Sequence, residues 1–196
     1  MSISLKPIFS SYILPIIAMI AVIAASNILV QYSISDWLTW GAFTYPIVFL
    51  VSDLTNRIFG QRRAQLIAAI GFPFGMALSV VLSLQADLDV MSSIRISLAS
   101  GFAFICAQLL DIMIFNRMRK MVWWRAPLFS SILASALDTV IFFCAAFIGT
   151  GLPWVTWALG DFGVKLAVAF IMLIPFKIFL SLLVAFGNSP QRSKSL

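Results

Sequence analysis

Aspartates are the only acidic side chains of this 196-residue chain, which has seven of them and neither glutamate nor histidine. Four fall in or next to long apolar stretches: Asp53, Asp111, Asp138 and Asp161. A carboxylate in apolar surroundings is unstable unless it is paired, protonated or bound to a ligand. These four positions are therefore the first candidates for function.

Asp53 shares a helical face with an amide and a guanidinium. Asp53, Asn56 and Arg57 stand at i, i+3 and i+4, which places their side chains on one side of a helix. Asp53 and Asn56 can bind a polar ligand from this face. Alternatively, Asp53 and Arg57 form an intrahelical ion pair, and the sequence leaves both interpretations open.

A second polar face pairs an amide with a carboxylate. Gln108 and Asp111 lie one helical turn apart, and Phe104 and Phe115 extend the same stripe. Hydrogen-bonding groups beside aromatic rings suit a flat, polar solute. Packing between helices is the alternative interpretation.

Asp138 lies near the middle of an apolar stretch, with Ser131 and Ser135 on its face. A carboxylate at that depth needs a partner, a proton or a ligand. Lys165, which follows Asp161 at i+4, can pair with that neighbour or reach Asp138 from another helix.

The composition places all these groups in a membrane protein. Hydrophobic residues make up 62% of the chain and charged residues 10%, whereas soluble domains are roughly half apolar and a quarter charged. Cys106 and Cys144 lie inside apolar stretches, which argues against a disulfide framework or a metal site. The absence of histidine argues against zinc-hydrolase and Ser-His-Asp chemistry. We expect no cofactor, no metal and no nucleic-acid partner.

Six apolar stretches predict an all-α integral membrane bundle of six transmembrane helices in residues 1–186, followed by a short basic tail in residues 187–196. The predicted spans are Ile8–Leu29, Leu38–Phe59, Gln65–Leu84, Ile96–Phe115, Ala126–Ile148 and Val164–Phe186. Pro46 interrupts the second span, as is typical of helices that line a protein interior.

The loop charges predict the orientation. The two termini and the second and fourth loops hold ten cations: Lys6, Arg57, Arg62, Arg63, Arg117, Arg119, Lys120, Arg125, Arg192 and Lys194. The opposite side holds one, Arg95, together with Asp36, Asp87, Asp89 and Asp161. Because cytoplasmic loops carry the excess of lysine and arginine, both termini are expected in the cytoplasm.

The ordered motifs resemble the queuosine precursor transporters of bacteria. The residues that carry this resemblance are Ser26–Gln31, Thr39–Pro46, Phe49–Gly60, Gln108–Asp111, Phe115–Arg119, Trp123–Trp124 before Pro127, Asp138–Thr139 with Phe142–Phe143, and Asp161 with Lys165 and Pro175. The combination extends over five of the six spans and is specific, whereas a single Gln-x-x-Asp would be weak.

The resemblance implies a multi-pass transporter of the bacterial inner membrane, similar to vitamin uptake carriers. It implies import of 7-cyano-7-deazaguanine or 7-aminomethyl-7-deazaguanine for the tRNA base queuosine, with the lipid bilayer as surroundings and homo-oligomers left open. Candidate substrate-binding residues are Asn27, Phe43, Tyr45, Asp53, Asn56, Phe104, Gln108, Asp111, Asp138 and Lys165.

Other functions are compatible with parts of the sequence. A substrate-binding subunit of an energy-coupling-factor transporter has a similar length, and Ala21 and Ala25 offer a small-residue face for docking. Gly160–Gly163 slightly resembles an intramembrane protease motif, but the rest of that signature is absent, and we expect no enzyme. The chain has no P-loop. Facilitated diffusion and proton coupling through Asp138 or Asp53 both stay open.

Overall fold

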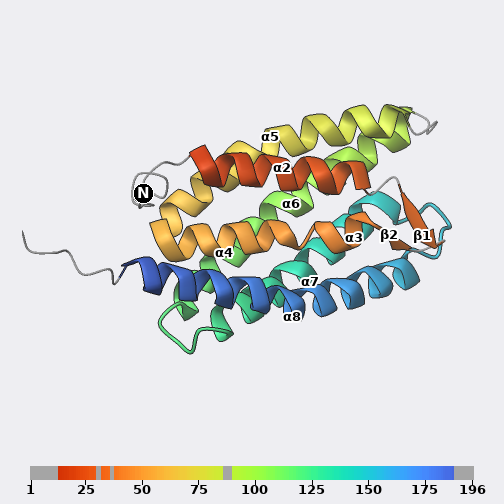
Figure 1. Ribbon diagram of the computed structural model, residues 1–196. Coiled ribbons are helices and arrows are strands. Elements are labelled where there is room, and N and C mark those ends of the chain that lie inside the picture. The colour runs from red at the N-terminus through yellow and green to blue at the C-terminus, as the bar shows by residue number, and fades with distance from the viewer. Residues whose placement is uncertain (1–12, 30–31, 36–37, 86–89, 188–196) are drawn as a thin grey trace, which may run out of the picture.

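The computed structural model describes residues 13–29, 32–35, 38–85 and 90–187, which form an elongated bundle of helices (Figure 1). Its elements are α2 Ile13–Leu29, β1 Ser33–Ser35, β2 Leu38–Thr39, α3 Gly41–Thr44, α4 Ile47–Phe59, α5 Gln61–Gln85, α6 Val90–Met118, α7 Arg125–Phe147 and α8 Trp154–Gly187. The predicted helical class is confirmed. Apart from Gly187, the predicted basic tail lies outside the described residues.

Four helices of the described part are long and apolar enough to cross a membrane. They are Gln61–Leu82 within α5, Val90–Met118, Arg125–Phe147 and Trp154–Leu183 within α8. Helix α2 is apolar but has 17 described residues. The second predicted span is divided between α3 and α4. The predicted count of six crossings therefore stays a prediction.

The helix ends divide between the two ends of the bundle (Figure 1). The first described turn of α2, the α4–α5 and α6–α7 connections and the end of α8 lie at one end. Strands β1 and β2, which pair antiparallel, and the α7–α8 connection lie at the other. This is the alternation expected of consecutive crossings. The cations of residues 57–63 and 117–125 consequently gather at one end.

Helix α4 lies at the centre of the bundle and contacts α2, α5, α6, α7 and α8. It begins after Pro46, which has no backbone N–H to continue a helix from α3. Its buried face consists of Val48, Phe49, Ser52, Asp53, Thr55 and Asn56. It ends at Gly60, whose φ of 88° lies in a region that favours glycine, and α5 follows at once.

Helix α8 begins at Trp154, well before the predicted start at Val164. Asp161, which was predicted to lie before the span, is therefore inside the helix, as is Lys165. The Gly160–Gly163 segment has the composition of a helix boundary. The helix nevertheless continues through it, because the Asp161 carboxylate in this segment is paired within the bundle. The strand pair β1–β2 was also not expected from the sequence.

Arg95 caps the C-terminal end of α7. It is the one cation that the sequence predicted for the loops on the side opposite the termini. Its guanidinium donates hydrogen bonds to the carbonyls of Ala145, at 2.8 Å, and Ile148, at 2.6 Å. These carbonyls belong to the last turn of a helix, where acceptors lack partners and a positive charge is favourable.

Close packing of α2 on α5 predicts that Gly71→Ala is destabilising. A Cβ at Gly71 would lie 2.8 Å from Cγ of Met19 and 3.0 Å from Cδ1 of Ile23, and both of those side chains are buried. Overpacking of this kind costs about 1–3 kcal/mol. We expect a lower melting temperature in detergent. Gly163→Ala is the matched control, because nothing lies within 4 Å of its Cβ. Equal melting temperatures for the two variants would contradict the packing.

Candidate functional site

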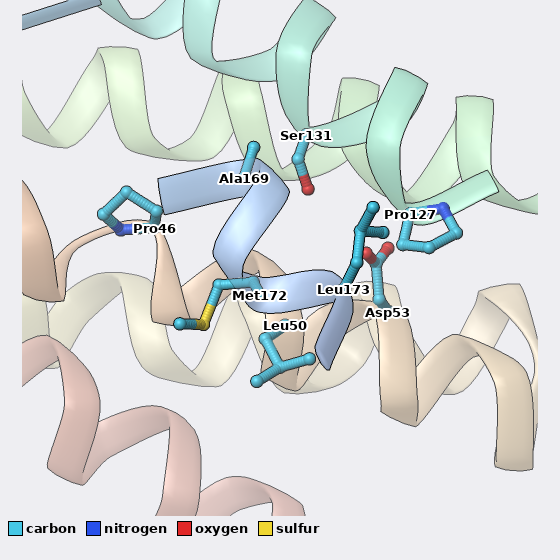
Figure 2. Close-up of a pocket in the computed structure, with 8 residues that line it drawn as sticks. All are labelled: Pro46, Leu50, Asp53, Pro127, Ser131, Ala169, Met172 and Leu173. Carbon is cyan, nitrogen blue, oxygen red and sulfur yellow. The ribbon is translucent and has the colours of Figure 1, made fainter. Parts of the chain in front are cut away.

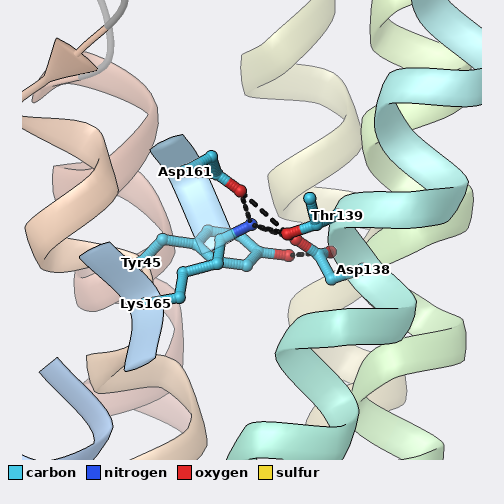
Figure 3. A network of polar contacts seen from close by, with 5 residues as sticks. All are labelled: Tyr45, Asp138, Thr139, Asp161 and Lys165. Atoms are coloured by element: carbon cyan, nitrogen blue, oxygen red, sulfur yellow. Dashed lines mark hydrogen bonds and ion pairs between the residues drawn. The ribbon is translucent and has the colours of Figure 1, made fainter. Parts of the chain in front are cut away.

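The first of two buried polar clusters surrounds Lys165, and we call it the lysine centre: Tyr45, Asp138, Thr139, Asp161 and Lys165 (Figure 3). The Lys165 Nζ lies 2.8 Å from Asp138 Oδ2 and 2.5 Å from Asp161 Oδ2. It also donates to Thr139 Oγ1 at 3.2 Å. The lysine therefore pairs with both of the partners that the sequence offered, one on α7 and one on its own helix.

Every polar group of the lysine centre has a partner. Thr139 Oγ1 donates to Asp161 Oδ2 at 2.9 Å, and the Tyr45 hydroxyl donates to Asp138 Oδ1 at 3.2 Å. The Tyr45 ring also lies under the ammonium, with Lys165 Nζ 5.6 Å from its centroid. The break before α4 places this tyrosine against α7 and α8. The centre thus joins three segments of the chain.

The second cluster, the carboxylate centre, lies between α4, α6 and α7: Ser52, Asp53, Asn56, Gln108, Asp111 and Ser130. All six residues are buried. Ser52 donates a short hydrogen bond to Gln108 Oε1, and Asn56 Nδ2 donates to the Ile112 carbonyl at 2.9 Å. Ser130 Oγ lies 3.4 Å from Asp53 Oδ1, and Asp53 and Asp111 are within electrostatic reach of each other.

Several atoms of the carboxylate centre have no hydrogen-bond partner among the described residues. They are both carboxylate oxygens of Asp111, the Gln108 Nε2 donor and the Asn56 Oδ1 acceptor. Asp111, Gln108 and Asn56 are each 0% exposed. Buried polar groups are rarely left unpaired, and exceptions commonly mark functional sites. These atoms form a set of donors and acceptors available to a bound molecule.

Aromatic rings connect the two centres. The Tyr45 ring makes edge contacts with Phe104 and Phe49, with centroids 6.3 Å away in each case. Phe104 is buried and stands one turn before Gln108 on α6. The predicted stripe of Phe104, Gln108 and Asp111 therefore begins beside Tyr45.

A narrow pocket opens beside Asp53, between α4, α7 and α8 (Figure 2). The Asp53 carboxylate and the Ser131 hydroxyl point into it, and its space suffices for about one water molecule. The remaining lining residues are Pro46, Leu50, Pro127, Ala169, Met172 and Leu173.

The structure brings eight of the ten predicted binding residues into the two centres and the aromatic contact between them, and it separates the other two. Phe43 is half-exposed on α3 against Trp40, and the Asn27 amide donates to its own helix at the Ile23 carbonyl. The alternative of an Asp53–Arg57 pair is wrong, because the Arg57 guanidinium donates to the Arg119 carbonyl at 2.5 Å.

Sequence reasoning missed two members of the carboxylate centre, Ser52 and Ser130. Both are small hydroxyl residues, which occur throughout membrane helices as packing groups and carry no distinguishing pattern. Ser52 stands one residue before Asp53, and Ser130 one residue before Ser131, which the sequence did single out. Within the described part of the chain, no three histidine, cysteine or acidic residues gather as a metal site would require.

Comparisons with known proteins agree with one another. Residues 39–180 match the protein family described as "Putative vitamin uptake transporter". The chain is 35% identical over 189 residues to the "Probable queuosine precursor transporter" of Haemophilus influenzae, with 80% of each chain covered. It is 34% identical over 175 residues to the "Queuosine precursor transporter" of Escherichia coli, with 79% of each chain covered. No solved structure matches the chain.

The lysine centre predicts a charge-dependent pattern of stability. Lys165→Met leaves the buried carboxylate of Asp138 and the partly exposed carboxylate of Asp161 without their cation, and breaking the buried Lys165–Asp138 pair costs about 3–5 kcal/mol. We expect little folded protein by fluorescence-detected size-exclusion chromatography. The triple variant Lys165→Met/Asp138→Asn/Asp161→Asn removes the charges of buried Asp138, of partly exposed Asp161 and of Lys165, and should recover much of the yield. A triple variant as poor as Lys165→Met would instead indicate that packing of the lysine stem is decisive.

Proposed function

Because the chain belongs to the queuosine precursor transporter family, we propose that it imports 7-cyano-7-deazaguanine, 7-aminomethyl-7-deazaguanine or both for queuosine synthesis. One observation supports the carboxylate centre as the place of binding. Gln108 and Asp111 stand on one face of α6 with buried, unpaired polar atoms. The energy-coupling-factor alternative has no comparable observation in its favour.

The chemistry of a 7-deazaguanine fits these atoms. Its pyrimidine ring presents an amide N–H, an exocyclic amine and a carbonyl along one edge. The two oxygens of an ionised Asp111 accept the N–H groups side by side, and Gln108 Nε2 donates to the carbonyl. Asn56 Oδ1 is a further acceptor within the same centre. Each unpaired protein atom then acquires a partner.

The flat faces of the base need apolar cover, and Phe104 and Tyr45 supply it in this proposal. Phe104 is on the same face of α6 as the polar groups, and Tyr45 contacts it from the α3–α4 break. Offset stacking on such rings favours a planar base over a flexible polar solute.

Asp138 and Lys165 act on the substrate through Tyr45 in this proposal. All three Lys165 N–H groups are used within the lysine centre. The centre fixes Tyr45 by accepting its hydroxyl hydrogen at Asp138. Asp138 and Lys165 are therefore positioning residues for the ring that covers the base.

We further propose six crossings of a bacterial inner membrane, with α2 and the α3–α4 pair completing the set and both termini in the cytoplasm. The bundle end with the 57–63 and 117–125 cations then faces the cytoplasm. The lysine centre lies toward the opposite end, on the side from which the substrate enters.

The uptake assay uses bacteria that cannot make the precursor. Cells receive nanomolar 7-cyano-7-deazaguanine, with or without this gene, and the queuosine content of their tRNA is measured. We expect modification to depend on the gene. Asp111→Asn should abolish it because an amide cannot accept both hydrogens, and Asp138→Asn should abolish it because Tyr45 and Lys165 lose their partner. Membrane insertion of both variants is verified by immunoblotting.

Leu109→Ala is the control on the same helix, since Leu109 is exposed on the outer face of α6. It should modify tRNA as the parent protein does. Normal queuosine in both aspartate variants would remove the carboxylate model. Gene-independent modification with well-inserted protein would refute the assigned substrate.

Stacking predicts a graded effect at Phe104. Phe104→Ala should weaken binding of the base to purified protein by about 1–3 kcal/mol, as base-aromatic stacking does elsewhere. Phe104→Leu keeps apolar volume without the ring and should recover only part of the loss. Binding is measured by isothermal titration calorimetry. Equal affinity of Phe104→Leu and the parent protein would show that Phe104 provides bulk rather than stacking.

A further inference from the structure

The carboxylate centre holds two acidic groups without a compensating cation among the described residues. Asp53 is 2% exposed and Asp111 is 0% exposed, and each lies within electrostatic reach of the other. The described ion pairs both involve Lys165, which is taken up by Asp138 and Asp161. The two centres therefore differ in charge balance.

The surroundings of the pair offer no charge to replace the missing cation. On α4, the Arg57 guanidinium is turned to the Arg119 carbonyl. Helix α6 presents Gln108, and helix α7 presents Ser130 and Ser131. Helix α8 presents Ala169, Met172 and Leu173 at this level, and Ala64 and Ala68 of α5 pack against Ile112.

Two ionised carboxylates in contact and away from water repel each other strongly and lose their hydration. Neighbouring carboxyl groups in proteins avoid this state by sharing one proton. Ser130 Oγ lies 3.4 Å from Asp53 Oδ1 and can hydrogen-bond to this carboxyl group. Asp53 then carries the shared proton, and Asp111 stays ionised so that its unpaired oxygens accept the N–H groups of the base.

The pocket beside Asp53 gives this proton a route. It is wide enough for about one water molecule, and the Asp53 carboxylate points into it (Figure 2). A water molecule there can pass a proton to Asp53, which lies within electrostatic reach of Asp111. Among the described residues no three histidine, cysteine or acidic side chains gather as a metal site would require, so we assign the centre to a proton.

We propose that the Asp53–Asp111 pair is a proton-binding site, and that its proton moves inward together with the imported base. The pair alone is a property of the empty protein, whereas the coupling rests on the proposed transport function. The proton on Asp53 keeps a second negative charge away from Asp111 while Asp111 binds the base, so loading of one depends on the other. The Lys165-paired Asp138 is excluded as the proton carrier by its existing partners.

The proton is tested first without any substrate, by infrared spectroscopy of the purified full-length protein at neutral pH. A protonated carboxyl group gives a C=O stretching band separate from the carboxylate bands, and the band shifts in deuterated water. We expect this band in the parent protein and its loss in Asp53→Asn/Asp111→Asn, which keeps the shapes of both side chains. An unchanged band in the double variant would overturn the proton site.

Coupling is tested in proteoliposomes with radiolabelled 7-cyano-7-deazaguanine. Counterflow measures transport alone, and accumulation under an inward pH gradient measures coupling. One proton for each base allows up to about tenfold accumulation for one pH unit. We expect this accumulation in the parent protein and its collapse with a protonophore. In Asp53→Asn, the ratio of gradient-driven uptake to counterflow should fall to the value measured without a pH gradient. In Leu109→Ala, this ratio should equal that of the parent protein.

The outcomes separate the two proposals. Counterflow without any response to the pH gradient overturns the coupling and leaves the proposed function standing. A response to a sodium gradient instead of a pH gradient overturns the choice of ion. Absence of counterflow refutes the assigned substrate and, with it, the coupled transport of that substrate. The infrared band still decides whether the Asp53–Asp111 pair holds a proton.

Discussion

The burial of charge in apolar surroundings is the constraint on which the arrangement of this protein depends. Lys165 cannot remain charged inside the bundle unless acceptors surround it, and Asp138, Asp161 and Thr139 supply them. Because these groups belong to α7 and α8, the requirement fixes the two helices relative to each other. The Tyr45 hydroxyl completes the set from the α3–α4 break, which gives the broken helix a defined position against the rest.

Both polar centres place charged groups in apolar surroundings, but they differ in how those groups are paired. The lysine centre is satisfied within the protein, so it can hold its geometry without a ligand. The carboxylate centre leaves donors and acceptors of Gln108, Asp111 and Asn56 unpaired, so its polar groups are completed only by something bound. A transporter needs both kinds of centre, because a binding site must exchange its contents while the helices around it keep their register.

The sequence predicted those features that depend on a rare residue at an unusual depth. Few polar groups occur in the spans, so the pairing of Lys165 with Asp138 and the Gln108–Asp111 face could be inferred from spacing and burial alone. The partner of Arg57 could not, because it is a backbone carbonyl of Arg119, and every residue has a carbonyl. The start of α8 was missed because glycine and aspartate favour helix ends locally, whereas the hydrogen bond that Asp161 accepts inside the bundle comes from Thr139 on another helix.

The helix break at Pro46 explains why the centres act on one another. An unbroken helix would present its side chains to neighbours at fixed intervals, and Tyr45 would turn with the rest of α4. The break instead lets Tyr45 point to Asp138 while its ring rests on Phe104, one turn from Gln108. Pro46 and Leu50 also line the pocket beside Asp53. A displacement of this short segment therefore changes the lysine centre, the aromatic cover and the pocket together.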